Sequence, residues 1–319
     1  MTKTGALAQI DKSAVRAERK RLILRDLRMN YVVYLMVLPV VAHFLIFNYR
    51  PMVGILMAFQ DFSIARGLWG SNWVGFDHFR TFFNSIFFSR LIRNTLAISI
   101  LRLVIFFPLP IIFALCLNEV RNQPFKRTVQ TISYLPFFIS VVVIASILRD
   151  FTSSEGIITQ IAMFFGDRGG ALIARPEWFR TLFVGQHIWS QLGFSSIIYI
   201  AALSAIDQEM YEAAKIDGAG RLKQTWYVTI PGIMPTVVVL LILQMGQLMN
   251  VGFEMILLLY SPATFETADV ISTYVFRVGI LDSNFSFSTA VNLFNSVINF
   301  ILIFGANMFS RRFSDTSLW

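Results

Sequence analysis

The chain has 319 residues, of which 55% are hydrophobic and only 14% are charged, whereas about a quarter of the residues in an average soluble domain are charged. This composition would leave extensive apolar patches on a water-soluble fold, so it excludes an ordinary soluble domain and predicts a membrane protein. Basic residues cluster in residues 1–28, just before the first apolar segment. Such a cluster is typical of a topology signal or a contact with anionic lipid, and we expect no nucleic-acid binding. The single cysteine, Cys116, excludes an internal disulfide and a multi-cysteine metal site.

Long segments with few or no charges predict the membrane spans, because a spanning helix needs about 20 mostly apolar residues. The predicted spans are residues 29–49, 94–118, 128–148, 181–206, 236–260 and 289–310. The fifth is placed after Pro231 and Pro235, which we expect to delay the start of the helix. The sequence therefore predicts an all-α membrane protein with six transmembrane helices.

The distribution of Lys and Arg predicts the orientation of these spans. Most basic residues fall in the N-terminal tail, in the loops after the second and fourth spans, and at Arg311 and Arg312. Because cytoplasmic segments are enriched in Lys and Arg, both termini are predicted to be cytoplasmic. The predicted organisation is a basic cytoplasmic tail at 1–28, a six-span domain at 29–310 with a cytoplasmic loop at 206–232, and a cytoplasmic tail at 311–319.

The predicted outside segment 51–92 is rich in aromatic side chains. Phenylalanine and tryptophan residues are interleaved there with Arg80 and Arg90. Such a mixture suits an element that lies in the headgroup region of the bilayer.

The loop between the fourth and fifth spans contains the stretch EAAKIDGAG, residues 212–220. Asp207 can cap a helix of about two turns, and Gly218 and Gly220 can end it in left-handed conformations. Ala213 and Ala214 give this helix a smooth side that another protein surface can approach closely. The same pattern is compatible with an ordinary connecting loop, so from the residues alone both interpretations stay open.

The longer stretch EAAKIDGAGRLKQTWYVTIP resembles the EAA loop of bacterial ABC importer permeases. The positions that match are Glu212, Ala213, Ala214, Asp217, Gly218, Ala219, Trp226 and Pro231. Tryptophan stands where the family usually has phenylalanine, and Val228 and Ile230 stand where isoleucine and leucine are usual. The stretches NWVGFDHFRTFFNSIFFSRLIRNTL and YLPFFIS are similar to regions of maltose-type permeases. NYRPMVGILMAFQDF resembles the subgroup that imports oligo- or polysaccharides, such as the alginate and aldouronate importers.

This resemblance implies a type I ABC importer permease fold in the bacterial cytoplasmic (inner) membrane and the import of a carbohydrate. It also implies coupling to separate ATP-binding subunits through Glu212, Ala213, Ala214, Asp217, Gly218 and Ala219. The implied partners are a second homologous permease, two ATP-binding subunits and an extracytoplasmic solute-binding protein. No GxxxxGK[ST] occurs in the sequence, so we expect no cofactor on this chain, with ATP and Mg²⁺ held by the partner ATPase.

Polar residues inside the predicted spans are costly, and each is a candidate for a substrate pathway. On one continuous helix, Gln244, Gln247, Asn250 and Glu254 of the fifth span would share one side, and Asn292, Asn295 and Asn299 of the sixth would share another. These stripes can line a passage that binds sugar hydroxyls, or they can join helices to one another.

Arg102 is the one charged residue within the second span. It can attract an acidic sugar, pair with Glu254, contact the backbone or extend to the membrane surface. His187 is a lone histidine on an apolar helix, and we expect a packed position for it rather than a metal ligand.

Two other classes of protein compete with an importer permease. An ion-coupled secondary carrier would show inverted repeats and broken helices at corresponding positions, and the sequence shows neither. An intramembrane enzyme would need a nucleophile with a nearby base or paired acids at membrane depth, whereas only the isolated Glu254 and His187 occur. The sequence therefore predicts a transport subunit without a catalytic site.

Overall fold

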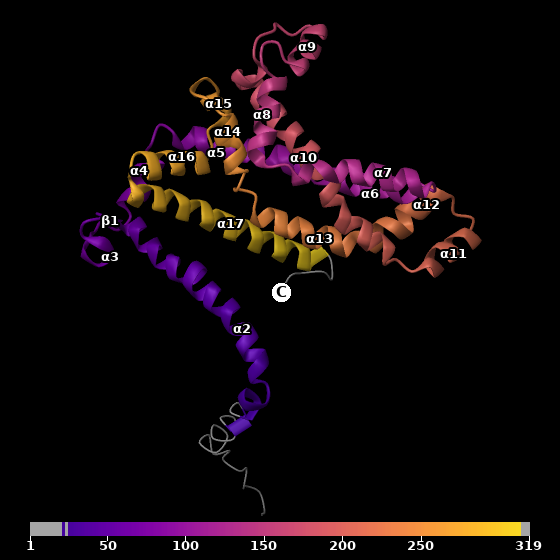
Figure 1. Ribbon diagram of the computed structural model, residues 1–319, viewed down its shortest axis with the longest axis horizontal. Coiled ribbons are helices and arrows are strands. Elements are labelled where there is room, and N and C mark those ends of the chain that lie inside the picture. Colours follow the sequence, from indigo (N-terminus) through magenta and orange to yellow (C-terminus); the bar gives the residue numbers. More distant parts are fainter. Residues whose placement is uncertain (1–20, 23–24, 314–319) are drawn as a thin grey trace, which may run out of the picture. The chain divides into compact units, whose positions relative to one another are not determined.

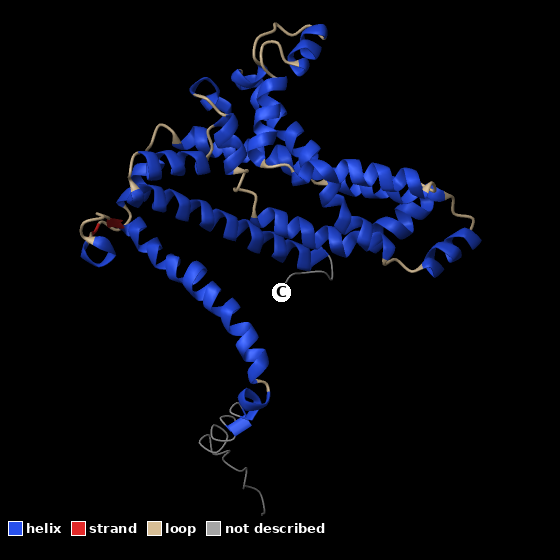
Figure 2. Ribbon diagram, viewed as in Figure 1, coloured by secondary structure: helices blue, strands red, loops and turns tan. Residues whose placement is uncertain are grey.

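Helices make up nearly all of the regular structure in the described part of the computed structural model, residues 21–22 and 25–313 (Figure 2). The strands described, β1 (Gln60–Asp61) and β2 (Asn72–Trp73), form one short antiparallel pair with Gln60 opposite Trp73. The prediction of an all-α protein is confirmed. The predicted tails, 1–28 and 311–319, lie largely outside the described residues, so their cytoplasmic location stays a prediction.

The chain divides into two units, residues 1–56 and 57–319. The first unit contains α2 (Tyr31–His43), the π-helical turn η1 (Phe44–Tyr49) and most of the 3₁₀ segment η2 (Arg50–Phe59). Together they form a 29-residue stretch that is long and apolar enough to cross a membrane. No residue of α2 is buried. A helix that is apolar on all sides and unburied is suited to a lipid environment, as the first predicted span requires.

The second unit contains the remaining elements, shown in chain order by the colours of Figure 1. Its first half consists of α3 (Gly67–Gly70), α4 (Asp77–Phe83), α5 (Phe88–Leu101), η3 (Arg102–Phe106), α6 (Pro108–Glu119), α7 (Gln123–Tyr134), η4 (Leu135–Phe138), α8 (Val141–Phe151), α9 (Ile157–Phe164), η5 (Leu172–Ala174) and α10 (Pro176–Ser204). Its second half consists of α11 (Gln208–Ile216), α12 (Arg221–Gln224), η6 (Thr225–Thr229), α13 (Ile230–Gly246), α14 (Phe253–Leu259), η7 (Pro262–Thr264), α15 (Phe265–Ala268), α16 (Ile271–Phe276), η8 (Arg277–Leu281) and α17 (Phe285–Phe313).

Four continuous helical segments among the described residues can cross a membrane, and two bent pairs raise the possible number to six. The bent pairs are Gln123–Phe138 with Val141–Phe151, at 100°, and Pro176–Ser204 with Gln208–Ile216, at 67°. The predicted number of six spans therefore holds if each bent pair is one span. Several boundaries differ from the prediction: the second span begins at Phe88 and the sixth at Phe285.

The fifth predicted span, residues 236–260, is wrong at both ends. The helix runs without a break from α12 through the π turn η6 into α13, so neither Pro231 nor Pro235 delays it. Pro231 is the second residue of α13 and follows directly after the π turn η6, where the helical hydrogen-bond pattern changes. At the other end, α13 stops at Gly246 and α14 begins only at Phe253, after Gly252 with a positive φ of 76°.

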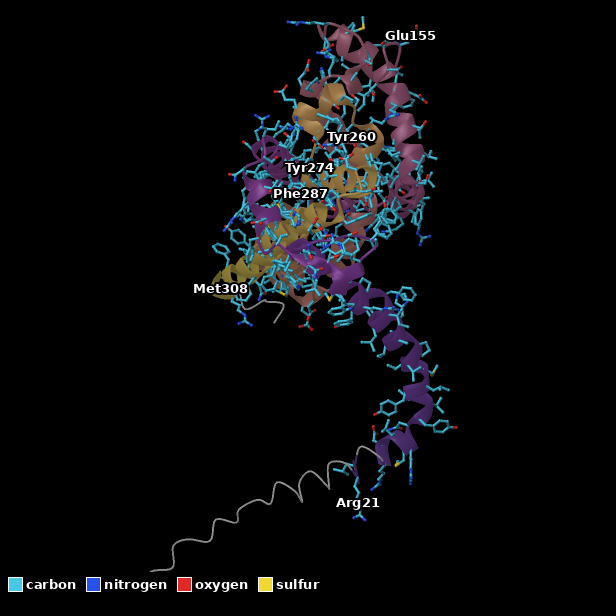
Figure 3. The ribbon with its side chains drawn as sticks, turned by 90° about the vertical axis from the view of Figure 1, so that its left-hand side faces the viewer. Arg21, Glu155, Tyr260, Tyr274, Phe287 and Met308 are labelled. Carbon is cyan, nitrogen blue, oxygen red and sulfur yellow. The ribbon has the colours of Figure 1, made fainter. Side chains whose placement is uncertain are left out.

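The aromatic segment 51–92 is divided between core and surface. Phe82 of α4 is fully buried and its ring lies 5.1 Å from that of Phe88 and 5.5 Å from that of Phe294. Trp69 remains highly exposed. The predicted headgroup element therefore describes only part of the segment, because α4 packs against α17 in a core cluster that also includes Tyr274 and Phe287 (Figure 3).

Candidate functional site

The helix α11 matches the prediction made from the EAA stretch. The Asp207 side chain accepts a hydrogen bond from the Glu209 N–H at 3.0 Å and so caps the helix. At its C-terminal end, Gly218 has φ +75°, and the N–H of Ala219 donates to the Ala214 carbonyl at 2.9 Å. This left-handed glycine ends the helix.

Gly220 has a different role from the one predicted. Its φ of −67° and ψ of 168° are those of extended backbone, and it is the residue before α12. One left-handed residue, Gly218, is sufficient to end α11. Gly220 instead turns the chain into the second short helix, α12.

The surface of α11 is open to a partner. No residue of this helix is buried, and Ala213 is exposed. Large apolar side chains surround it: Ile216 and Leu222 are each 88% exposed, and Trp226 is 68% exposed. Figure 1 shows α11 at the end of the second unit, apart from the long helices. Exposed large apolar residues within one short stretch of chain, here α11, α12 and η6, mark an interaction surface.

Three side-chain contacts connect this exposed region to the spans. The Tyr211 hydroxyl hydrogen-bonds the Thr229 hydroxyl at 3.0 Å, which joins α11 to the start of α13. Arg221 of α12 lies 3.5 Å from the Glu119 carboxylate at the end of α6. The Gln224 side-chain amide donates to the Ala219 carbonyl at 2.7 Å. The Tyr211–Thr229 contact could not be predicted from residue types alone, because it depends on how the loop folds back.

The break after α13 changes the geometry of the predicted polar stripe in the fifth span. Gln244 lies on α13, Gln247 and Asn250 lie in the break, and Glu254 lies in the first turn of α14. They do not share the side of one continuous helix, so that part of the prediction is wrong. The helix ends at Gly246, before Gln247, and the left-handed backbone at Gly252 separates the break from α14.

Asn250 nevertheless gathers polar residues from both predicted stripes. Its side-chain oxygen accepts from Asn295 at 3.3 Å and from Asn299 at 3.5 Å, and its amide donates to Gln247 at 2.9 Å. Gln244, Glu254 and Asn292 have no side-chain hydrogen bond to this group within the described residues. We call Gln247, Asn250, Asn295 and Asn299 the amide cluster.

The same region supplies partners for the irregular backbone of the break. The Asn299 side-chain oxygen accepts from the Met249 N–H at 3.0 Å, and the Ser99 hydroxyl donates to the Leu248 carbonyl. Non-helical backbone at membrane depth requires such partners or a hydrated cavity. Asn295 is buried, whereas Gln247 and Asn250 are exposed. The cluster thus joins α17 to the break through the buried Asn295 and the half-buried Asn299, and it presents polar groups on its exposed side.

Arg102 contacts a histidine rather than Glu254. Its Nε donates to Nε2 of His187 at 3.0 Å, which joins the second span to α10. The His187 ring also lies 4.5 Å from the Phe106 ring. The proposed Arg102–Glu254 pair is therefore absent from the described residues, and Glu254 is exposed in the first turn of α14.

An exposed helix tied to the spans and a polar break within them are together the features of a membrane transport subunit. The model of the family described as "binding-protein-dependent transport system inner membrane component" matches residues 106–315. The chain belongs to this family of bacterial inner-membrane permeases, the transport subunits of ABC importers. It has no catalytic activity of its own.

Two curated relatives from Bacillus subtilis (strain 168) resemble nearly the whole chain. The polygalacturonan/rhamnogalacturonan transport system permease protein YteP is 43% identical over 303 residues, which is 95% of this chain and 94% of YteP. Protein LplB is 44% identical over 287 residues, 90% of each chain.

Solved structures agree with these relatives. A chain in the crystal structure of a bacterial ABC transporter that imports the acidic polysaccharide alginate is 42% identical, with a TM-score of 0.84 over 91% of this chain and 98% of that one. A chain of a bacterial alginate ABC transporter in complex with an alginate pentasaccharide-bound periplasmic protein is 41% identical, with a TM-score of 0.85 over 92% and 99%.

Proposed function

We propose that this permease imports acidic oligo- or polysaccharides, built at least partly of uronate units, which an external solute-binding protein delivers. The support is chemical agreement between the relatives: polygalacturonan, rhamnogalacturonan and alginate are the polymers in their names, and alginate is described as acidic. The observation that carries the proposed mechanism is α11, which has no buried residue and is tied to α13 through Tyr211 and Thr229.

Coupling to ATP hydrolysis is proposed to use α11 and its C-terminal turn. Ala213 offers a smooth, exposed backbone surface, and Glu212 and Asp217 frame it with charge. Gly218 and Ala219 fix where the helix ends. When two ATP-binding subunits close around ATP and Mg²⁺, a helix seated on them is carried along as a rigid body. The contacts Tyr211–Thr229 and Arg221–Glu119 then pass this movement to α13 and α6.

The proposed substrate passage lies beside the exposed side of the amide cluster. Gln247 and Asn250 present amide groups there, and amides both donate to and accept from sugar hydroxyls. Two further polar side chains are Gln244, on α13 just before the break, and Asn292, on α17. Arg102 is already hydrogen-bonded to His187, so we assign it a structural role within the spans.

Other chains are required for this mechanism. We propose a second homologous permease, two ATP-binding subunits and an extracytoplasmic binding protein, with both termini of this chain in the cytoplasm. ATP and Mg²⁺ are assigned to the ATP-binding subunits, since the sequence has no phosphate-binding GxxxxGK[ST] loop.

Reconstitution tests this function directly. The complete complex in liposomes should import oligogalacturonate only when the binding protein is present and ATP is available to the ATP-binding subunits. A neutral maltooligosaccharide of equal length is the control substrate. Uptake driven by a proton or sodium gradient without ATP would instead identify an ion-coupled carrier, and uptake of the neutral sugar alone would overturn the assignment to acidic polymers.

A further inference from the structure

Away from α11, two arginines from different spans reach the same short segment. Arg93 of α5 donates to the Glu266 carbonyl at 3.5 Å, and Arg180 of α10 donates to the Thr267 carbonyl at 3.4 Å. These carbonyls belong to consecutive residues of α15, a four-residue helix. The two guanidinium groups therefore lie against one segment, although the residues are far apart in the sequence.

Arg180 is held in place by a buried amide. Its Nη2 donates to the Asn94 side-chain oxygen at 2.9 Å, and Asn94 is fully buried. The Asn94 amide in turn donates to the Asp269 carbonyl at 3.0 Å. These bonds use two of the five donors of the Arg180 guanidinium. A rigid guanidinium with donors to spare is suited to bind a further acceptor.

Among the described residues, Glu266 offsets part of the Arg180 charge from a distance, and no carboxylate pairs directly with either arginine. Asp269, whose backbone carbonyl accepts from Asn94, has a buried carboxylate. That carboxylate already pairs with Arg90 at 3.1 Å and Arg277 at 2.8 Å. Within the described residues, neither Arg93 nor Arg180 has an ion pair within 4.0 Å, and Glu266 is exposed. Two positive charges against neutral carbonyls leave a local excess of charge, which favours an anion.

We propose that Arg93 and Arg180 form a carboxylate-binding site for the uronate groups of the substrate at the extracytoplasmic side of the permease. This inference rests on the proposed function and on the predicted orientation, which places the segment between the fifth and sixth spans outside. Guanidinium forks bind carboxylates through charge-assisted hydrogen bonds, which are stronger than the amide contacts available at Gln247 and Asn250. The pair would favour acidic over neutral sugars before the substrate reaches the amide cluster.

The test is binding of oligogalacturonate to the full complex in phosphatidylcholine nanodiscs by calorimetry, without the solute-binding protein. The matched ligand is the carboxyl-reduced oligosaccharide of equal length. We expect the double variant Arg93→Gln/Arg180→Gln to weaken binding of the acid about tenfold or more, with less than a twofold change for the neutral ligand. Arg180→Lys keeps the charge but loses the fork, so it should give an intermediate loss.

Arg80→Gln is the control variant, because Arg80 is an exposed arginine of α4 whose partner is Asp77. It should bind both ligands like the unchanged complex. If the double variant binds both ligands more weakly to the same extent, the arginines only support α15. The proposal is also overturned if the double variant binds the acid as tightly as the original complex does, or if the original complex does not bind the acid at all. Failure of the proposed function is distinguishable, because it appears as absent import of oligogalacturonate in liposomes.

Discussion

The α11 region and the amide cluster are built in different ways. In α11, the cap at Asp207 and the stop at Gly218 involve residues within a few positions of one another. In the amide cluster, Asn250 meets Asn295 and Asn299, which are 45 and 49 residues further along the chain. The α11 region is a local structure on the surface, whereas the amide cluster depends on how the break after α13 packs against α17. This difference determines which substitutions should affect coupling and which should affect the fold.

The largest effect is expected at Gly218, the local stop of α11. A valine there must adopt φ near +75°, which costs roughly 1–2 kcal/mol even though its Cβ would meet no neighbour within 4 Å. Gly218→Val should reduce ATP-dependent import more than tenfold while the protein still inserts. Transport and ATPase rates in liposomes measure this.

Gly220→Ala provides the matched control for that variant. Gly220 also has open space around its Cβ position, but its φ of −67° suits any residue. Import should stay within about twofold of the unchanged protein. Equal losses in both variants would show that flexibility of the turn, rather than the left-handed stop, matters.

The next effect concerns the backbone of the break. Asn299→Leu removes the acceptor of the Met249 N–H, and an unsatisfied buried donor costs roughly 1–3 kcal/mol. We expect a lower melting temperature in detergent and weaker transport. Asn292→Leu should leave the melting temperature nearly unchanged, because Asn292 is exposed on the same helix. A stable Asn299→Leu variant would mean that water can replace the side chain.

A smaller effect is expected for the contact between α11 and α13. Tyr211→Phe removes only the hydroxyl that meets Thr229, a hydrogen bond with a net contribution of about 1 kcal/mol. The number of ATP molecules hydrolysed per sugar imported should rise a few-fold, with insertion unchanged. Tyr227→Phe, at an exposed ring of η6, is the control. An unchanged ratio for Tyr211→Phe would assign transmission to Arg221–Glu119 alone.

The smallest effect is a pH dependence in the loop before α10. Arg175, 2.6 Å from Asp167, holds the pKa of that carboxyl below its usual value, with further hydrogen bonds from the Gly169 N–H and Trp178. Because the folded pKa is lowered, the stabilisation is present above the ordinary pKa of about 4 and is lost as pH falls through the lowered value. Hydrogen exchange of residues 165–178 should be insensitive to this group between pH 8 and 5. Asp167→Asn should raise exchange in that range.

The sequence predicted what depends on local chemistry. The capping aspartate, the left-handed glycine and the number of apolar segments all follow from residue types and short spacings. It failed at the break after Gly246, because residues 247–252 contain no charge and no proline, and Gly246 and Gly252 are the only signals of an interruption. The pairing of Arg102 with His187 was likewise hidden, since the partners are 85 positions apart.

The contact between α11 and the start of α13 has a mechanical consequence. This helix has 17 residues and is therefore about 25 Å long, with the Thr229 contact at one end and the amide cluster beyond the other. A tilt of about 10° at the ATPase end would displace the far end by roughly 4 Å, given that length. A displacement of this size is comparable to the width of a sugar ring. In the proposed mechanism, a rigid tilt of this helix is therefore enough to open or close the passage without any refolding of the chain.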